Sequence, residues 1–204
     1  MIVHDFEQYS LEWWKTRRGL PSASRAGEIL TPTGRKPAGQ HKYMAELIIA
    51  TLQLEEDDDI QTEHMLRGLE MEEDARLWYE YQTNSDIGQV GLIVNDNGTA
   101  CCSPDGVKWE HEHEHEIVGG LEIKCPMAKN HLLYAIEGVL PPAYRPQVHM
   151  SMVVTGLRSW TFMSYFPELE PFVIEVDWDG YTDNMEAELT KFTTELKQLK
   201  DKYL

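Results

Sequence analysis

Two charges inside an apolar run constrain the fold of this chain more than any other feature of its sequence. Residues 119–126 read GGLEIKCP and place Glu122 and Lys124 two positions apart. Side chains alternate between the faces of a strand, so these two charges project together, while Leu121 and Ile123 face the opposite way, toward a core. An edge strand with one face in water fits this pattern, and so does a strand that carries a reactive site. Residues elsewhere in the chain must decide between the two.

A second carboxylate lies 17 positions before Glu122. Asp105 lies in the sequence SPDG, at a strand end or turn. Two carboxylates on neighbouring strands can bind hard divalent cations through oxygen, and a nearby lysine can orient the attacking water or help to deprotonate it. Phosphodiester hydrolysis requires both functions. The pattern of Asp, spacer and ExK is common by itself, however, and SPDG is also a good type I turn.

A third carboxylate comes from the helix that we expect over residues 62–82. The face of this helix that we expect to point inward consists of Met65, Gly68, Glu72, Ala75 and Tyr79. Glu72 is the acid on this face, whereas Glu70 and Asp74 point away from it and Glu73 lies at its flank. A carboxylate that reaches the same centre as Asp105 and Glu122 explains Glu72 better than an unrelated structural role.

The remaining pattern predicts one domain over residues 1–204, without an obvious linker. Trp13 and Trp14 would anchor a short helix or turn to the core, and Ser22 or Ser24 would cap a second helix. Apolar residues spaced by three and four predict a helical tail that packs against the core or a partner. These helices are expected in 5–18, 22–30, 41–54 and the tail stripe Met185, Leu189, Phe192, Leu196, Leu199 and Tyr203.

Further segments are expected as strands, turns and loops. We expect strands over 89–96 and 99–110, joined by a hairpin turn at NDNG, and again over 159–166 and 172–176. The stretch 127–156 reads as a short helix, a proline-rich turn, and a helix or strand that contains Gln147. We interpret EEDDD, residues 55–59, as a solvated acidic loop, and EHEHEHE, residues 110–116, as a hairpin tip rather than a metal site of His111, His113 and His115.

The composition limits the classes of function. A formal charge of −17 would repel nucleic acid unless the basic residues gather in one place. The three cysteines include an adjacent pair, Cys101 and Cys102, which is poor geometry for a structural disulfide and favours a reducing cytoplasm. No apolar run reaches the length of a membrane span, and the N-terminus lacks the layout of a signal peptide.

Six segments together resemble a known family: WWKTRRGLPSAS, GLEMEEDA, CCSPDGV, GLEIKCP, YRPQVHMSMVVTG and SWTFMSYFP. In this order they are similar to the phage lambda exonuclease and YqaJ-type viral recombinase nucleases of the PD-(D/E)xK superfamily. The resemblance implies an α/β (α+β) fold with a central mixed sheet flanked by helices. It also implies a Mg²⁺ cofactor, with Mn²⁺ as a substitute, and 5′-to-3′ degradation of one strand of linear duplex DNA. A homotrimeric ring and a single-strand annealing recombinase as partner, in the cytoplasm of a bacterial host, follow from the same resemblance.

The resemblance also implies roles for individual residues. Asp105 and Glu122 would hold the metal, the backbone carbonyl of Ile123 would add a ligand, and Lys124 would activate the water. Glu72 would assist at the metal or the water, and Gln147 would face the site.

The basic segment near the N-terminus matches the family's site for the 5′ phosphate. Arg17, with Ser24 and Ser103, would receive that phosphate, and Arg18 is the alternative if the register slips by one. The ring would grip DNA through Arg17 together with Arg25, Arg35, Lys36 and Lys42. A structure-specific or restriction-like endonuclease, and a non-catalytic interaction protein with the same fold, are the other two classes of function that we considered.

Overall fold

The strand that carries Glu122 and Lys124 lies in the middle of a five-stranded sheet. The computed structural model describes residues 1–53, 63–110 and 116–204, with the backbone alone for 63–70. Strand β6 (Ile117–Lys124) pairs antiparallel with β5 (Gly106–Trp109) and parallel with β7 (Ser159–Ser164). The sheet is completed by β2 (Ile87–Gly88) and β8 (Phe172–Asp177), in the order β2-β5-β6-β7-β8. The edge-strand interpretation is therefore wrong, because β6 has a hydrogen-bonded neighbour on each side.

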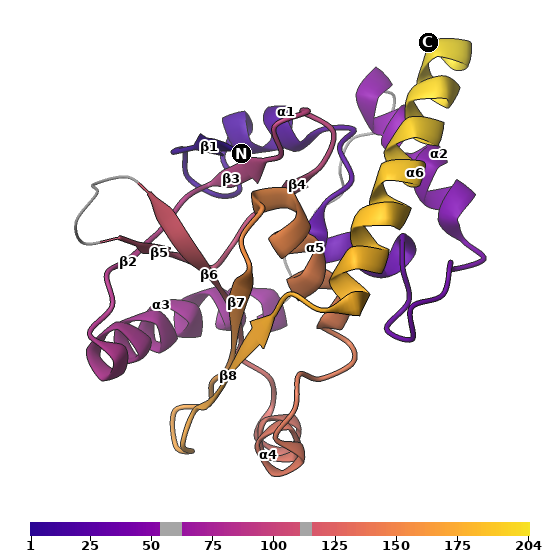
Figure 1. The fold of residues 1–204 in the computed structure, drawn as a ribbon. Coiled ribbons are helices and arrows are strands. Elements are labelled where there is room, and N and C mark those ends of the chain that lie inside the picture. Colours follow the sequence, from indigo (N-terminus) through magenta and orange to yellow (C-terminus); the bar gives the residue numbers. More distant parts are fainter. Residues whose placement is uncertain (54–62, 111–115) are drawn as a thin grey trace.

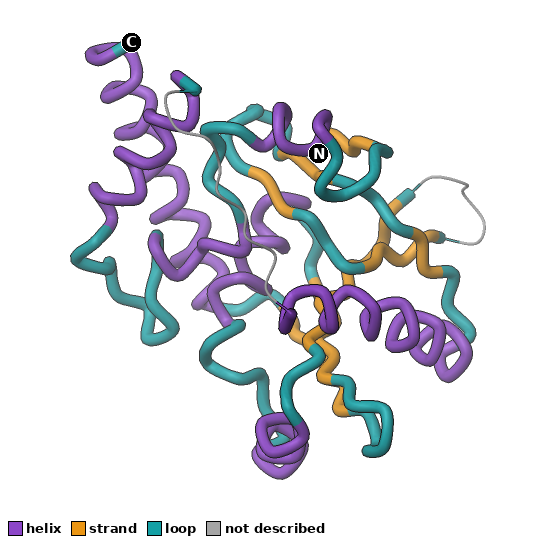
Figure 2. Tube along the Cα trace, turned by 180° about the vertical axis from the view of Figure 1, so that it is seen from behind, coloured by secondary structure: helices purple, strands orange, loops and turns teal. Residues whose placement is uncertain are grey.

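Helices cover both faces of this mixed sheet, as expected. Helix α3 (Glu63–Thr83) lies across the strands (Figure 2), and its Ala75 and Tyr79 pack on Leu121 and Ile123. Helix α5 (Arg145–Thr155) covers the opposite face through a cluster of Val148, Met152, Trp160 and Phe162. The alternation read from the sequence is thus confirmed: the apolar face of β6 points to α3, and the face with Glu122 points to α5.

A glycine in β6 allows the α5 side to pack closely. A Cβ atom on Gly120 would lie 2.2 Å from the ring of Trp160, a distance that atoms do not tolerate. The ring of Trp160 instead packs directly over the backbone of β6, and Trp160 is 1% exposed. This contact fixes β6 against β7, and with it the positions of the charged residues that follow Gly120.

A smaller sheet joins the N-terminus to the segment before Asp105. Strand β3 (Leu92–Val94) lies between β1 (Ile2–His4) and β4 (Cys101–Cys102), all antiparallel. The predicted hairpin turn is confirmed, with Gly98 donating to the carbonyl of Asn95 at 2.9 Å. The strand predicted over 99–110 is instead two strands in different sheets, β4 and β5. The segment Ser103–Asp105 is where the chain passes from one sheet to the other.

Helices from both ends of the chain complete the molecule (Figure 1). The first helix, α1 (Leu11–Arg17), buries Trp13 as predicted, while the segment after it forms a 3-10 helix, η1 (Ala23–Glu28), rather than an α-helix. Ser22 occupies the N-cap position of η1 without a capping side-chain hydrogen bond. The predicted helix over 41–54 is α2 (Gln40–Leu52), and the short helix after β6 is α4 (Ala128–Glu137).

The tail is helical, as its periodicity predicted. Helix α6 (Gly180–Tyr203) buries Met185, Leu189, Phe192 and Leu196 in the core, while Tyr203 at the end of the stripe is 64% exposed. The acidic segment 55–59 and the histidines at 111, 113 and 115 lie outside the described residues, as do the side chain of Met65 and the burial of Gly68. In the described parts of the chain, no helix is both long and apolar enough to cross a membrane.

Candidate active site

Asp105, Glu122 and Lys124 meet at the end of the central strand. The ammonium group of Lys124 contacts Glu122 Oε1 and lies 3.9 Å from Asp105 Oδ2. Glu122 and Lys124 are neighbours because they are two positions apart on one face of β6. Asp105 joins them because it directly precedes β5, the antiparallel neighbour of β6. The structure therefore brings together the three residues that the sequence singled out first.

The backbone of β6 holds Asp105 in place. The amide of Ile123 donates to Asp105 Oδ2 at 2.6 Å, and the amide of Asp105 donates to the carbonyl of Leu121 at 3.1 Å. On the α3 side, Arg76 donates to the backbone carbonyl of Asp105 at 3.2 Å. The N–H and C=O of one strand residue point to the same side of the strand, so the Ile123 carbonyl also points toward Asp105. This direction suits the ligand role expected for that carbonyl.

Glu122 is held by α5. The side-chain amide of Gln147 donates to Glu122 Oε1, the same oxygen that Lys124 contacts. Glu122 is 1% exposed, so both partners compensate the cost of burying its charge. The position of Gln147 on the first turn of α5 explains how a residue 25 positions away reaches the strand.

Burial and mutual repulsion raise the pKa of the carboxyl groups. The pKa of Glu72 rises to about 8, because of burial first and the charge of Asp105 second. The pKa of Glu122 rises to about 7 through burial, although Lys124 lowers it in part. Burial also raises the pKa of Asp105. The neighbouring carboxylates raise the pKa of Lys124 well above its usual range despite its burial, so Lys124 is a cation.

The donor set fits a hard divalent cation. Oxygen ligands are offered by three carboxyl groups and one carbonyl: Asp105, Glu122, Glu72 and the carbonyl of Ile123. The three carboxylates together carry more negative charge than the single positive charge of Lys124 can balance. Among the described side chains, no three of the Asp, Glu, His or Cys type already form a metal-binding group. The contact with Lys124 is made by Oε1 of Glu122, so it is compatible with a metal at the other oxygen of the same carboxylate.

These residues lie at one end of a cleft of about 840 Å³. Asp105, Glu122, Lys124, Glu72 and Gln147 all line it. Its other walls come from α1, η1 and α2, so the cleft runs from the sheet to the N-terminal helices. We call the five residues above the reaction half of the cleft.

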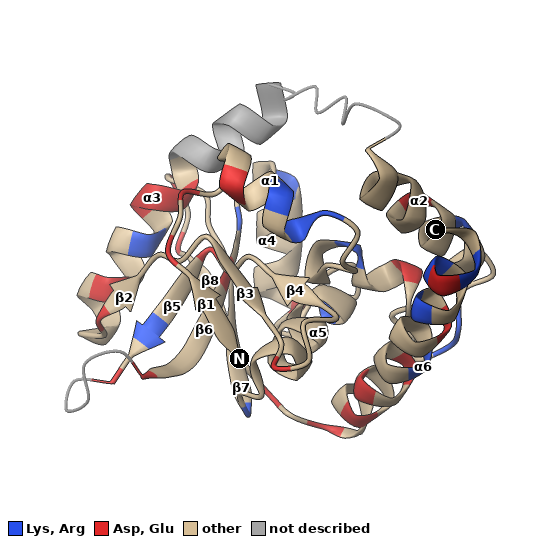
Figure 3. Ribbon diagram, turned by 90° about the horizontal axis from the view of Figure 1, so that it is seen from above, with Lys and Arg blue, Asp and Glu red and all other residues tan. Residues whose placement is uncertain are grey.

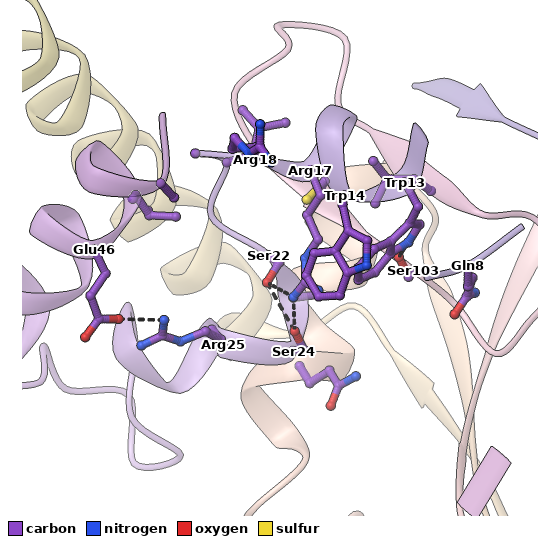
Figure 4. Close-up of a pocket in the computed structure, with 18 of the residues that line it drawn as sticks. Gln8, Trp13, Trp14, Arg17, Arg18, Ser22, Ser24, Arg25, Glu46 and Ser103 are labelled. Carbon is purple, nitrogen blue, oxygen red and sulfur yellow. Dashed lines mark hydrogen bonds and ion pairs between the residues drawn. The ribbon is translucent and has the colours of Figure 1, made fainter. Parts of the chain in front are cut away.

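A basic pocket forms the other half. The guanidinium of Arg17 donates to the hydroxyls of Ser22 and Ser24, at 2.9 Å each, and lies 4.5 Å from the centre of the Trp13 ring (Figure 4). Trp13 in turn donates from its indole nitrogen to the hydroxyl of Ser103 at 2.9 Å. We call Arg17, Ser22, Ser24, Trp13 and Ser103 the end half of the cleft.

The two neighbouring arginines, Arg17 and Arg18, point in different directions. Figure 4 shows Arg17 pointing at Ser22 and Ser24, while Arg18 points away from them. Because the two hydroxyls and the Trp13 ring carry no charge, the cation of Arg17 is not neutralised by these contacts. Arg17 is therefore the arginine that contacts Ser22 and Ser24, while Arg18 also lines the cleft but points elsewhere.

The other predicted DNA-binding residues are not gathered at one place. Arg25 and Lys42 line the cleft, but Arg25 pairs with Glu46 at 2.7 Å and Lys42 lies 3.8 Å from the same carboxylate. Arg35 and Lys36 are exposed in the loop between η1 and α2 and do not line the cleft. Figure 3 shows basic positions in α1 and the segment after it, whereas acidic positions are spread over α3 and α6.

Two supporting residues escaped the sequence analysis. Trp13 was expected only as a core anchor, yet its indole nitrogen donates to Ser103 and the guanidinium of Arg17 stacks on its ring. Arg76 supports the backbone of Asp105 from α3. The position of Arg76, four residues after Glu72 and so on the same side of the helix, was the one available signal.

Comparisons relate this chain to a known family and to solved exonuclease structures. Residues 12–158 match the model of a family described as the YqaJ-like viral recombinase domain. The structure of an alkaline exonuclease from Laribacter hongkongensis is similar, with 30% identity, a TM-score of 0.79, and coverage of 94% of this chain and 95% of that chain. A structure of the same exonuclease in complex with dAMP gives 30% identity and a TM-score of 0.74, over 95% of this chain and 97% of that chain.

A more distant structure shares the fold. A phage-related exonuclease from Haemophilus somnus 129PT matches with a TM-score of 0.67 at 11% identity, over 91% of this chain and 96% of that chain. Among curated proteins, nothing matches this sequence. The family match spans both halves of the cleft, from Trp13 to Gln147, and the chain belongs to the YqaJ-like viral recombinase domain family.

Proposed function

We propose that this chain is a Mg²⁺-dependent exonuclease that degrades the 5′-ended strand of linear duplex DNA. Family membership and the similarity to an alkaline exonuclease support a nuclease of the phage exonuclease type. The proposed direction of degradation, from the 5′ end, is supported by the cleft, in which the Arg17 pocket and the carboxylates of the reaction half lie together. A site for a terminal phosphate next to the reacting centre suits an enzyme that works from an end.

The reaction half would hold the metal and the water. Asp105, Glu122 and the Ile123 carbonyl are the proposed Mg²⁺ ligands, and Glu72 would assist from α3. A bound Mg²⁺ would supply positive charge against the phosphate oxygens and lower the pKa of the attacking water. Gln147 would keep Glu122 oriented through its hydrogen bond.

Lys124 would act as a hydrogen-bond donor. Its neighbours keep it protonated, so in this arrangement it donates to the attacking water or to a phosphate oxygen rather than accepting a proton. Its contact with Glu122 also keeps the ammonium on the reactive face of β6. Both features favour electrostatic stabilisation of the transition state as its role.

The proposed reaction leaves a new 5′ phosphate on the DNA, the group that the pocket would bind. Water adds to phosphorus, the P–O3′ bond breaks, and the released nucleotide leaves with a 3′-hydroxyl that takes up a proton. The remaining strand then begins with a new 5′ phosphate, which can enter the pocket of Arg17, Ser24 and Ser103. Repeated removal of nucleotides from one end follows from this cycle.

The biological setting is part of the proposal. Exposed 3′ single strands are substrates for strand annealing, so the partner would be a single-strand annealing recombinase of phage type. The family's name, which describes a viral recombinase domain, supports this setting. We further propose that residues 1–204 form one nuclease domain and assemble as a homotrimeric ring, as the sequence resemblance implies.

Matched DNA substrates test the proposal. The protein is incubated with Mg²⁺ and either linear duplex or covalently closed circular duplex of the same sequence, and with strands labelled at one end or the other. We expect mononucleotides from the linear substrate, beginning at the 5′ ends, and an intact circle. Cutting of the circle would instead identify an endonuclease, and release from 3′ ends would reverse the proposed direction. Linear DNA left intact with both Mg²⁺ and Mn²⁺ would overturn the proposed activity.

A further inference from the structure

Tyr9, just before α1, has a backbone conformation that its residue type disfavours. Its φ is +64°, in the left-handed region where residues other than glycine are uncommon and strained. Two other non-glycine residues in the described chain share this region, Gln53 and Asn84. Both of these directly follow the end of a helix, where a left-handed residue is ordinary. Tyr9 precedes a helix, so this explanation does not apply to it.

Tyr9 brings an aromatic ring to the cleft, near charged groups of both halves. Tyr9 lines the same cleft as Arg17 and Asp105, and the residue remains 41% exposed. Its ring centre lies 5.2 Å from that of Trp13, with the planes tilted by 40°. Trp13 is the ring that also carries the Arg17 guanidinium. One buried indole thus supports both the anion-binding cation and the exposed tyrosine.

The charges near Tyr9 come from both halves of the cleft. Burial, then the charges of Glu72 and Asp105, raise the pKa of its hydroxyl, while Arg17 and Lys124 lower it in part. The phenol is therefore neutral at physiological pH and does not repel a phosphate backbone. A neutral, partly exposed aromatic ring beside a phosphate pocket is what single-stranded nucleic acid uses for stacking.

We propose that Tyr9 is a stacking platform for the base of the terminal nucleotide whose phosphate is held by Arg17. This inference rests on the proposed function and deepens it, by assigning the base as well as the phosphate a place in the cleft. Because every base has a π-face, the platform would accept all four bases and favour an unpaired terminal nucleotide over an intact base pair. The alternative is that Tyr9 only packs on Trp13 and helps α1 to fold.

A binding measurement separates these roles without using nuclease activity. Isothermal titration compares dAMP, which carries a 5′ phosphate and a base, with 2-deoxyribose 5-phosphate, which lacks the base, in the presence of EDTA. We expect the unmodified protein to bind dAMP at least ~5-fold more tightly, the lower range of a single base stacked on an aromatic ring. Tyr9→Phe should keep this preference, and Tyr9→Leu should reduce it to less than about 2-fold, because leucine offers no π-face.

Two further variants control for folding. Tyr81→Leu makes the same change on α3, at an exposed residue that does not line the cleft, and should leave the preference unchanged. Tyr9→Gly removes the ring and the backbone strain together, so it should lose the preference while its thermal midpoint stays the same or rises. Loss of the preference in Tyr9→Phe, its survival in Tyr9→Leu, or equal binding of the two ligands by the unmodified protein would overturn the platform. Undetectable binding of dAMP would do the same.

The nuclease assay distinguishes failure of this inference from failure of the proposed function. If linear duplex is degraded from 5′ ends but dAMP and the sugar phosphate bind equally, the stacking platform alone is wrong. If the base preference is present and depends on Tyr9, but no linear duplex is degraded, the proposed exonuclease activity alone is wrong.

Discussion

The two halves of the cleft solve different problems with different materials. The reaction half is fixed by the backbone of a sheet. The backbone of β6 accepts a hydrogen bond from the amide of Asp105 and donates one to its side chain, and Glu122 lies on the central strand. The end half is assembled from α1, the start of η1 and the segment after β4. It is held by contacts between side chains, those of Arg17 with Ser22, Ser24 and Trp13 and that of Trp13 with Ser103. Reacting groups must be positioned accurately, and a sheet provides that rigidity. A pocket that only binds a ligand can be built from less rigid elements.

The two halves also differ in charge. The reaction half has three carboxylates and one ammonium, and the raised pKa values of Glu72 and Glu122 show that this excess is costly. In the end half, Arg17 contacts hydroxyl groups and a ring, so its charge is available to an anion. Arg25, in the same cleft, is paired with Glu46 and Glu28. The reaction half therefore favours a bound cation and the end half a bound anion. This difference fits the proposed metal in the reaction half and the proposed phosphate in the end half.

The largest effect is expected from removing one charge in the reaction half. Asp105→Asn keeps the size of the side chain and an oxygen that can accept from the Ile123 amide, but loses a metal ligand's charge. We expect cleavage of linear duplex to fall by at least ~10³-fold, within the range that loss of a metal's catalytic contribution allows. The thermal midpoint and duplex binding, measured by fluorescence anisotropy, should be nearly unchanged. Normal turnover by this variant would remove Asp105 from the site.

The next largest effect is expected at Lys124. Lys124→Ala keeps the proposed metal ligands and removes the cation beside the attacking water, so the rate should fall by about 10²–10⁴-fold. The Mg²⁺ concentration for half-maximal rate should not rise, because the ammonium competes with the metal for Glu122. Both values come from a Mg²⁺ titration of the initial rate. A loss of only a few-fold would mean that Lys124 has no part in the chemistry.

The sequence predicted the reaction half well because its geometry follows from local periodicity. The alternation of β6 put Glu122 and Lys124 on one face, and the helical spacing of α3 put Glu72 on the same side as Ala75 and Tyr79, both buried. These rules hold wherever the element forms, and they do not depend on how the elements are arranged. The order of the strands was less accessible. Nothing within residues 119–126 reveals that β6 pairs with β7, in a register that sets Glu122 beside Phe162, 40 positions later.

The end half was predicted by resemblance rather than by periodicity. Arg17 and Ser24 are close in sequence, but Ser103 is far from both, and its approach depends on β4 ending beside α1. Trp13 joins them through one hydrogen bond and one stacked cation, and such contacts between side chains leave no pattern along the chain. The strain at Tyr9 could not be predicted either, since tyrosine gives no sign of a positive φ.

A smaller effect is expected when the cation of the end half is removed. Arg17→Ala should leave the reaction half intact but lose the preference for a 5′-phosphate over a 5′-hydroxyl end, a preference we expect to be about 10-fold, or 1.4 kcal/mol, in the unmodified protein. The measurement is the initial rate on matched linear duplexes with either end, at one fixed ionic strength, because phosphate contacts weaken as salt rises.

Two arginine variants serve as controls for this comparison. Arg18→Ala removes the neighbouring cation that points away from the serines, and Arg25→Ala removes one that is already paired with Glu46. Both should keep the preference. Equal rates on both kinds of end in the unmodified protein would eliminate the pocket, and a preference that persists in Arg17→Ala but disappears in Arg18→Ala would move the phosphate to Arg18.

The smallest expected effect is on stability, and it tests the excess of negative charge directly. Folding raises the pKa of Glu122 from 4.5 to about 7 and that of Glu72 from 4.5 to about 8, so the folded protein binds more protons than the unfolded chain between these values. Stability without metal should therefore fall as pH rises toward about 8. His149 has the opposite effect at lower pH, because burial lowers its pKa from 6.5 to about 4, so the measurement should begin near pH 6.5. Within this window we expect the thermal midpoint in EDTA to fall by a few degrees, and Mg²⁺ to raise it more at pH 8 than at pH 6.5, because metal binding requires deprotonated carboxylates.

Three variants test which carboxyl groups cause this pH dependence. Glu72→Gln should flatten the upper part of the curve of thermal midpoint against pH, and Glu122→Gln the lower part. Glu73→Gln removes an exposed charge next to Glu72 and should keep the original slope. A midpoint that rises with pH in EDTA would mean that folding does not raise the pKa values of Glu72 and Glu122. An equal effect of Glu73→Gln would mean that the general charge of −17, and not the reaction half, sets the pH dependence.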